Sequence, residues 1–202
     1  IIHMFKALKK YFSDIWRVWS TWTGVRVLAL FTSYNMGLFA ITTMTPLYLR
    51  ANHDFSWFET ALAMAAMMTA GALAQPWMGK ISDGIGRRPL IILGNALACG
   101  AAIIAWAFSS VAITLVALGV AMTALVAIRA VLQAAAVDHA GNREGTSLGL
   151  TFAFMDGFAA TAAVLAGLAG ESDLANAFLL ASGFSLIAVV LALTLPKKQH
   201  VG

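Results

Sequence analysis

The chain has 202 residues, of which 60% are hydrophobic and only 11% are charged, and its mean hydropathy is +0.83. Because soluble domains carry about 25% charged residues, this composition excludes an ordinary soluble domain and indicates a protein that crosses a membrane several times. The net charge of +4 does not indicate nucleic acid binding, since the lysines and arginines stand at the ends of apolar segments. Anionic lipid is the counter-charge that we expect.

Residues 1–24 are predicted to form an amphipathic interfacial helix ahead of the first membrane span. Bulky apolar side chains recur at helical spacing along one side, and charged side chains occupy the other side. The apolar side holds Phe5, Leu8, Phe12, Ile15, Trp19 and Trp22, and the charged side holds Lys6, Lys9, Lys10, Asp14 and Arg17. We expect this helix to lie on the cytosolic leaflet with its tryptophans at headgroup depth, either as a linker to a preceding unit or as a plain surface anchor.

Residues 25–196 contain six apolar segments that approach the length of about 20 residues with which a helix crosses a bilayer. These segments are Val27–Leu49, Trp57–Met78, Leu90–Phe108, Ala112–Ala136, Thr146–Ala169 and Leu174–Leu195. Residues 197–202 remain as a short cytosolic tail. The sequence therefore predicts an all-α integral membrane protein with six transmembrane helices.

The connections between these segments distribute their charge unequally. One side carries Lys6, Lys9, Lys10, Arg17, Arg26, Lys80, Arg87, Arg88, Arg143, Lys197 and Lys198. The other side carries Arg50 together with the acids Asp54, Glu171 and Asp173. Because basic residues are retained on the cytosolic side, we expect both termini in the cytosol, as an even number of spans also requires. The cell (inner) membrane is the expected location.

The stretch from Gly79 to Pro89, with the sequence GKISDGIGRRP, connects the second and third segments. Its glycines permit tight backbone paths, and Pro89 is suited to the first turn of the following helix. We therefore expect a short cationic loop that folds back between neighbouring helices at the cytosolic membrane surface.

Within this stretch, Gly79, Asp83, Gly86, Arg87 and Arg88 form the pattern Gly-x-x-x-Asp-x-x-Gly-Arg-Arg, which resembles the signature loop of the major facilitator superfamily. The six-segment layout resembles one six-helix half bundle of such a transporter. The basic amphipathic start and the turn at residues 138–149 are similar to those of the C-terminal half. The resemblance implies secondary active or facilitative transport of a small solute by alternating access, as uniport, symport or antiport, with the solute held between two halves.

For Asp83 and Arg87 the resemblance implies a conformational latch. In the family, the loop acid meets a helix end of the opposite half in one access state, and the arginine supports that acid. A carboxylate at a helix N-terminus gains about 0.3 to 2 kcal/mol, which is small enough to be made and broken in every cycle. The partner that this latch requires is a complementary six-helix half, which is covalently joined, a separate subunit or a second copy.

Two ionisable residues stand deep within apolar segments, Arg129 in the fourth and Asp156 in the fifth. Burying either one in a bilayer costs at least about 2.5 kcal/mol, so each is expected to face the bundle interior or a wet cavity. Their depths differ by only a few ångströms at about 1.5 Å per residue, which places them to pair. Gln133 shares the helix face of Arg129. Two interpretations are open, a path for substrate charge or protons and a static buried ion pair.

In the first segment, Tyr34 and Asn35 interrupt an otherwise apolar run. The resemblance implies that this helix borders the substrate cavity, which makes the two residues candidates for hydrogen bonds to the solute. Ordinary polar packing between helices is the alternative interpretation. These polar positions do not identify the solute, since they fit sugars, organic anions and amphipathic drugs alike.

Enzyme chemistry, metals and cofactors are not indicated by the sequence. The histidines His3, His53, His139 and His200 lie far apart, and Cys99 is the single cysteine. No Walker-type phosphate-binding run occurs either. The partners that we expect are a small solute, the lipid bilayer and the complementary half. The alternative function is a non-transporting six-span scaffold or assembly subunit of a larger membrane complex.

Overall fold

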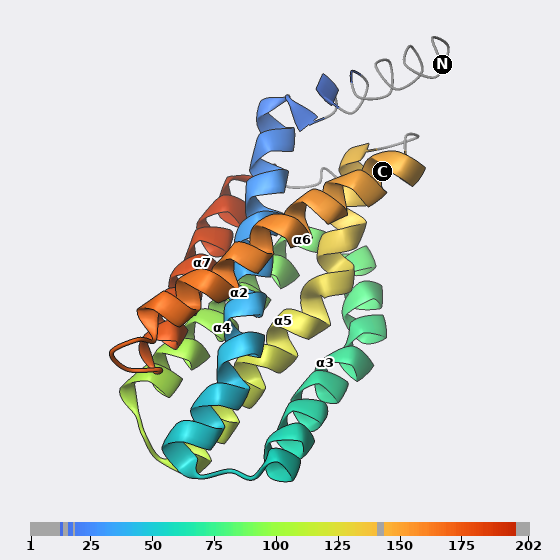
Figure 1. The fold of residues 1–202 in the computed structure, drawn as a ribbon. Coiled ribbons are helices and arrows are strands. Elements are labelled where there is room, and N and C mark those ends of the chain that lie inside the picture. Colours follow the sequence, from blue (N-terminus) through green and yellow to red (C-terminus); the bar gives the residue numbers. More distant parts are fainter. Residues whose placement is uncertain (1–12, 14–15, 18, 141–143, 197–202) are drawn as a thin grey trace.

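The computed structural model describes residue 13 and residues 16–17, 19–140 and 144–196, with the backbone alone described at 140, 144–148, 150, 151 and 154. Six helices follow one another along this part of the chain (Figure 1). They are α2 (Trp22–His53), α3 (Trp57–Ile85), α4 (Arg87–Ala107), α5 (Val111–Ala140), α6 (Glu144–Ala169) and α7 (Asn176–Thr194). Most of the interfacial helix expected in residues 1–24, part of the turn at 138–149 and all of the tail at 197–202 lie outside the described residues.

These helices confirm the predicted all-α membrane fold. No strand occurs in the described ranges, and α2, α3, α4, α5 and α7 are each long and apolar enough to cross a membrane. In α6, the part from Met155 to Ala169 forms a shorter apolar helix. The described helices therefore correspond one to one with the six predicted spans, and the protein is an integral membrane protein.

Trp19, in the segment ahead of α2, packs against the bundle. Its side chain is only 5% exposed, and its ring lies 5.1 Å from the ring of His139 near the end of α5. Trp16 and Trp22, by contrast, are largely exposed. Trp22 already belongs to α2, so the last turn of the expected linker is the first turn of the first span.

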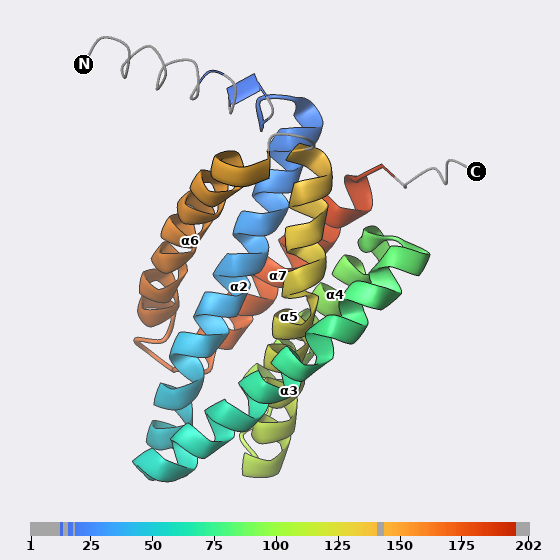
Figure 2. The ribbon, with the colours of Figure 1, turned by 90° about the vertical axis from the view of Figure 1, so that its right-hand side faces the viewer.

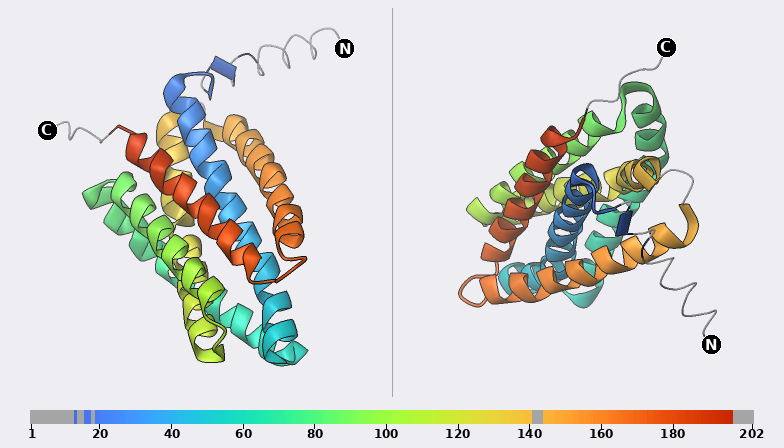
Figure 3. Two further views of the ribbon diagram at one scale, coloured as in Figure 1. Left: turned by 90° about the vertical axis from the view of Figure 1, so that its left-hand side faces the viewer. Right: turned by 90° about the horizontal axis from the view of Figure 1, so that it is seen from above.

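The helices form a bundle with α2 in the middle. Figure 2 shows α2 between α6 and α5, and α7 and α4 cover the opposite face (Figure 3, left). α5 packs between α3 and α4, whereas α3 has one main neighbour, α5, and α6 has one main neighbour, α2. Only 17% of the most apolar stretch of α3 is buried, so much of this helix is free for lipid or for another polypeptide.

Glycines set the close approach of α3 and α4 to α5. A Cβ atom at Gly71 would lie 2.6 Å from Cβ of Val126, and one at Gly94 would lie 2.5 Å from Cγ2 of Ile128. Neither position has room for a side chain, which is how small residues allow membrane helices to pack closely. The Gln75 side chain adds a polar link, because its Nε2 donates to the carbonyl oxygen of Val126 at 3.0 Å.

The start of α2 and the end of α7 lie at the same end of the bundle, which we call the termini end (Figure 1). Two arginines contact the last turn of α7 there. Arg26 Nη1 donates to the carbonyl oxygen of Thr194, and Arg88 Nη2 donates to that of Leu193, each at 2.5 Å. The last carbonyls of a helix have no partner within the helix, and cations are favoured beside them. These two contacts therefore join the starts of α2 and α4 to the end of α7.

We expect the double variant Arg26→Gln/Arg88→Gln to loosen the last turn of α7. Each hydrogen bond contributes about 1 kcal/mol, so amide exchange in residues 190–196 should accelerate by about fivefold for each bond lost. Hydrogen–deuterium exchange with mass spectrometry on the detergent-solubilised protein measures this directly. Lys80→Gln is the control for loss of charge, because Lys80 is exposed and makes no hydrogen bond or ion pair with a described residue. Equal exchange in the double variant and this control would show that the contacts do not stabilise α7.

Candidate functional site

The hairpin between α3 and α4 is tighter than the sequence predicted. The second span was expected to end at Met78, but α3 continues to Ile85, and α4 begins at Arg87. Gly86 alone separates the two helices, with a φ of +92°, a conformation that favours glycine. Gly79 and Gly84 lie within α3 and have no atom near the place of a Cβ, so the expectation that they open tight backbone paths was wrong.

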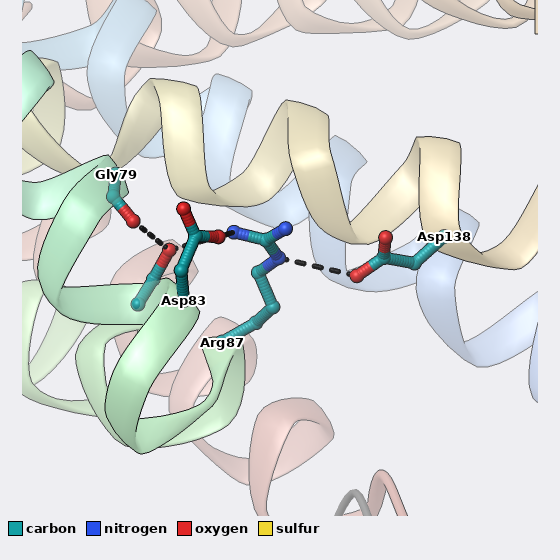
Figure 4. A network of polar contacts seen from close by, with 5 residues as sticks. Gly79, Asp83, Arg87 and Asp138 are labelled. Atoms are coloured by element: carbon teal, nitrogen blue, oxygen red, sulfur yellow. Dashed lines mark hydrogen bonds and ion pairs between the residues drawn. The ribbon is translucent and has the colours of Figure 1, made fainter.

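This hairpin positions a charged group that we call the hairpin cluster, formed by Ser82, Asp83, Arg87 and Asp138. Arg87 Nη1 contacts Asp83 Oδ1 at 2.8 Å and donates to Ser82 Oγ at 2.7 Å, while Arg87 Nε contacts Asp138 Oδ2 at 3.1 Å. Figure 4 shows the guanidinium between the two carboxylates. Ser82 Oγ in turn donates to the carbonyl oxygen of Gly79 at 2.6 Å. Arg87 therefore ties the end of α3 to the end of α5.

The two acids of the hairpin cluster differ in their access to solvent. The Arg87 side chain is 21% exposed, that of Asp138 is 44% exposed and that of Asp83 is 69% exposed. Exposed ion pairs contribute about 0 to 1 kcal/mol, so this cluster is weak enough to rearrange. Asp83 keeps one face open to a further partner.

The structure brings together only part of the signature pattern, whose residues we predicted to form the latch. Asp83 and Arg87 meet in the hairpin cluster, the carbonyl oxygen of Gly79 accepts a hydrogen bond from that cluster and Gly86 makes the turn, but Arg88 donates to the end of α7. Sequence reasoning missed Asp138. The available signal was its place at the end of the fourth span, on the same predicted side of the membrane as Arg87.

A second group of polar residues, which we call the polar strip, crosses the middle of the bundle and consists of Tyr34, Asn35, Arg129 and Asp156. Tyr34 is fully buried, and its hydroxyl donates to the carbonyl oxygen of Leu125 in α5 at 2.5 Å. Asn35 is 5% exposed, and its Nδ2 donates to Asp156 Oδ1 in α6 at 3.2 Å. Consecutive residues of α2 thus point to different neighbours, because successive helical positions are about 100° apart.

Arg129 and Asp156 do not form the ion pair that their similar depth in the sequence had suggested. The ion pairs among the described residues all involve Arg87, and none joins Arg129 to Asp156. The reason is the position of α2, because α5 and α6 each pack more extensively on α2 than on each other. Arg129 is half-buried and lies one helical turn beyond Leu125, the residue whose carbonyl oxygen accepts from Tyr34. Gln133 is exposed and makes no hydrogen bond to a described residue.

Elsewhere in the described part of the chain we find neither a metal site nor a polar pocket. Among the described residues, no group of three or more His, Cys, Asp or Glu side chains lies close enough to hold a metal ion. An open groove of about 560 Å³ lies between α4 and α5, but its lining, which includes Leu97, Gly100 and Val116, is apolar. This groove is a hydrocarbon surface, separate from the polar strip and the hairpin cluster.

Curated relatives match part of the chain. A proline/betaine transporter of Escherichia coli (strain K12) is 34% identical over 89 residues, which cover 44% of this chain and 17% of the relative. A proline/betaine transporter of Salmonella typhimurium (strain LT2) is 34% identical over 68 residues, which cover 34% of this chain and 14% of the relative. The matched regions therefore span less than a fifth of either relative.

The family match is far more extensive. The model of the Major Facilitator Superfamily matches residues 27–202, and this range contains α3 to α7, nearly all of α2, the hairpin cluster and the polar strip. The tight charged hairpin and the intramembrane charges are thus features of a chain in which nearly the whole helical bundle matches one transporter family. The chain belongs to the Major Facilitator Superfamily.

Proposed function

We propose that this chain is one six-helix half of a transporter that moves a small solute across the membrane by alternating access. The observation that carries the proposal is Asp156, a carboxylate within a membrane helix whose described partner is the neutral side chain of Asn35. An ionisable residue inside a membrane is costly and marks a solute or proton path by default. Family membership and the names of the relatives support the same function.

The complementary half would cover the face that holds α3, α2 and α6. α3 and α6 have large surfaces without a neighbour among the described helices, and the α6 surface near Asp156 includes the exposed small residues Gly149, Ala153 and Ala160. Small residues admit the close approach of another helix. In this arrangement the polar strip lies at the midplane, between the two halves.

The hairpin cluster would act as the latch between the halves. The charged termini end of the bundle faces the cytosol in this proposal, by the retention of basic residues on that side. The exposed carboxylate of Asp83 meets a helix N-terminus of the other half in one access state, while Arg87, which Asp138 holds in place, supports it. Its release in the other state costs little, because the contact lies at a solvated surface.

The first solutes to test are those in the names of the relatives, proline and betaine. We expect the protein, purified in mild detergent with any partner that it retains and reconstituted in proteoliposomes, to take up radiolabelled proline or betaine. Asp156→Asn should lower the uptake at least about tenfold, because a lost interaction with a charged group costs about 1.5–3 kcal/mol. Lys80→Gln is the control and should leave uptake unchanged.

Two outcomes would count against this proposal. Uptake that is unchanged in Asp156→Asn would remove this carboxylate from the path. A protein that takes up neither these solutes nor any other from a metabolite panel, while its α6 face crosslinks to unrelated membrane helices, would be a scaffold and not a transporter half.

A further inference from the structure

We propose that the polar strip is a two-pole receptor for a zwitterionic solute, in which Asp156 binds the ammonium group and Arg129 binds the carboxylate. This inference rests on the proposed transport function and names the class of its substrate. In a static ion pair, Arg129 and Asp156 would neutralise each other. In this proposal each of them binds one of the two charged groups of the solute.

The two charges lie at similar depth, on opposite flanks of α2. Tyr34 and Asn35 are consecutive, so their partners Leu125 in α5 and Asp156 in α6 lie at similar heights in the bundle. Arg129 is four residues beyond Leu125 on the same face of α5, which is about 6 Å further along the helix. Figure 2 shows α5 and α6 on either side of α2, so the two helices that carry these charges flank the face of α2 that the other half would cover.

Neither charge is neutralised by a described residue of the chain. Arg129 makes no hydrogen bond or ion pair with any of them, and Asp156 accepts from the neutral amide of Asn35. Keeping two opposite charges apart in a membrane interior costs more than pairing them. A zwitterion supplies both counter-charges at once. A cation would leave Arg129 without a counter-charge, and an anion would leave Asp156 without one.

Next to the Asp156 pole lies an aromatic surface. Phe152 is one helical turn from Asp156 on the same face of α6, it is partly exposed, and its ring centre lies 5.9 Å from that of Phe31. Aromatic rings attract cations and favour alkylated ammonium groups, which carry little water. The Asp156 pole therefore suits a methylated or cyclic ammonium better than a primary amine.

Three probes of nearly equal shape separate the two poles. Betaine carries both charges, choline keeps the trimethylammonium and lacks the carboxylate, and 3,3-dimethylbutyrate keeps the carboxylate and has carbon in place of nitrogen. Isothermal titration calorimetry on the purified protein with any retained partner measures the three Kd values. We expect betaine to bind at least about tenfold more tightly than either single-charge probe, because each single-charge probe leaves one charge of the protein without its counter-charge, and a loss of about 1.4 kcal/mol already lowers the affinity tenfold.

Removing the charge of Asp156 or of Arg129 should each abolish the preference for betaine over one of the two single-charge probes. In Asp156→Asn, betaine should lose its advantage over 3,3-dimethylbutyrate and keep its advantage over choline. In Arg129→Gln, betaine should lose its advantage over choline and keep its advantage over 3,3-dimethylbutyrate. Asp156→Glu and Arg129→Lys retain the charges and should preserve the ranking of the wild type, which guards against a general loss of folding. Lys80→Gln is the control for removal of a charge elsewhere.

The outcomes distinguish this inference from the transport proposal. If the wild type binds the three probes equally, or binds none of them while it takes up another solute, the two-pole receptor is wrong and transport stands. If both charge-removing variants lower the affinity for all three probes by the same factor, the residues act structurally and the inference is also wrong. If the protein takes up no solute at all, the transport proposal itself fails.

Discussion

Replacing Arg87 by glutamine should slow transport by up to about 30-fold, the factor that corresponds to the loss of two partly exposed ion pairs of up to about 1 kcal/mol each. Arg87 contacts Asp83 at 2.8 Å and Asp138 at 3.1 Å with different nitrogens of one guanidinium. Without it, two carboxylates face each other with no counter-charge, and the end of α3 is no longer tied to α5. Initial uptake rates in proteoliposomes measure the effect.

The lysine variant tests whether geometry or charge is responsible. Arg87→Lys keeps the charge but places it on one nitrogen, which does not reproduce the two-sided fork of arginine. We expect its uptake rate to fall between those of the wild type and Arg87→Gln. Lys80→Gln, in the same hairpin, should match the wild type. The cluster has no role in the cycle if Arg87→Gln transports as fast as Lys80→Gln.

The second large effect concerns stability, at the contact between α4 and α5. Gly94→Ala should destabilise the bundle by about 1–3 kcal/mol, the usual cost of overpacking a core. The added methyl group would lie 2.5 Å from Cγ2 of Ile128, a side chain that is 3% exposed. For a chain of this size, each kcal/mol corresponds to about 2–4 °C in Tm. Thermal unfolding in detergent, followed by circular dichroism, measures the shift.

Gly100→Ala provides a matched control on the same helix. No atom lies within 4 Å of the place of its Cβ, so alanine adds helix propensity without a clash. Its Tm should equal or exceed that of the wild type. In the double variant Gly94→Ala/Ile128→Ala, the loss should be smaller than the sum of the two single losses, because alanine at 128 makes room for the methyl group. Equal Tm values for Gly94→Ala and Gly100→Ala would contradict this close packing.

The sequence predicted the fold well because membrane spans have a strong physical signature. Long apolar segments bounded by charge are read directly from the chain, and all six correspond to described helices. Helix ends were less predictable. α3 continues through residues 79–85 because a polar stretch with two glycines still satisfies its backbone hydrogen bonds as a helix, and only the φ of Gly86 required a break.

The side-chain partners depended on packing that the sequence does not contain. Arg129 and Asp156 share a depth, but depth alone does not show that α2 lies between their helices. Asp138 joins Arg87 across 51 positions of sequence, and Asn35 joins Asp156 across 121. Such contacts follow from which helices are neighbours, and six similar apolar helices permit several arrangements. The polar residues themselves were visible in the sequence, but their pairing was not.

The single residue between α3 and α4 has a mechanical consequence. Because Gly86 alone connects α3 to α4, the two helices cannot slide past each other at this end. We therefore expect them to move together as one rigid unit. A partner that docked at Asp83 would therefore act on the end of α3 and on the start of α4 together, and Arg88 in that first turn of α4 donates to the carbonyl oxygen of Leu193 in the last turn of α7.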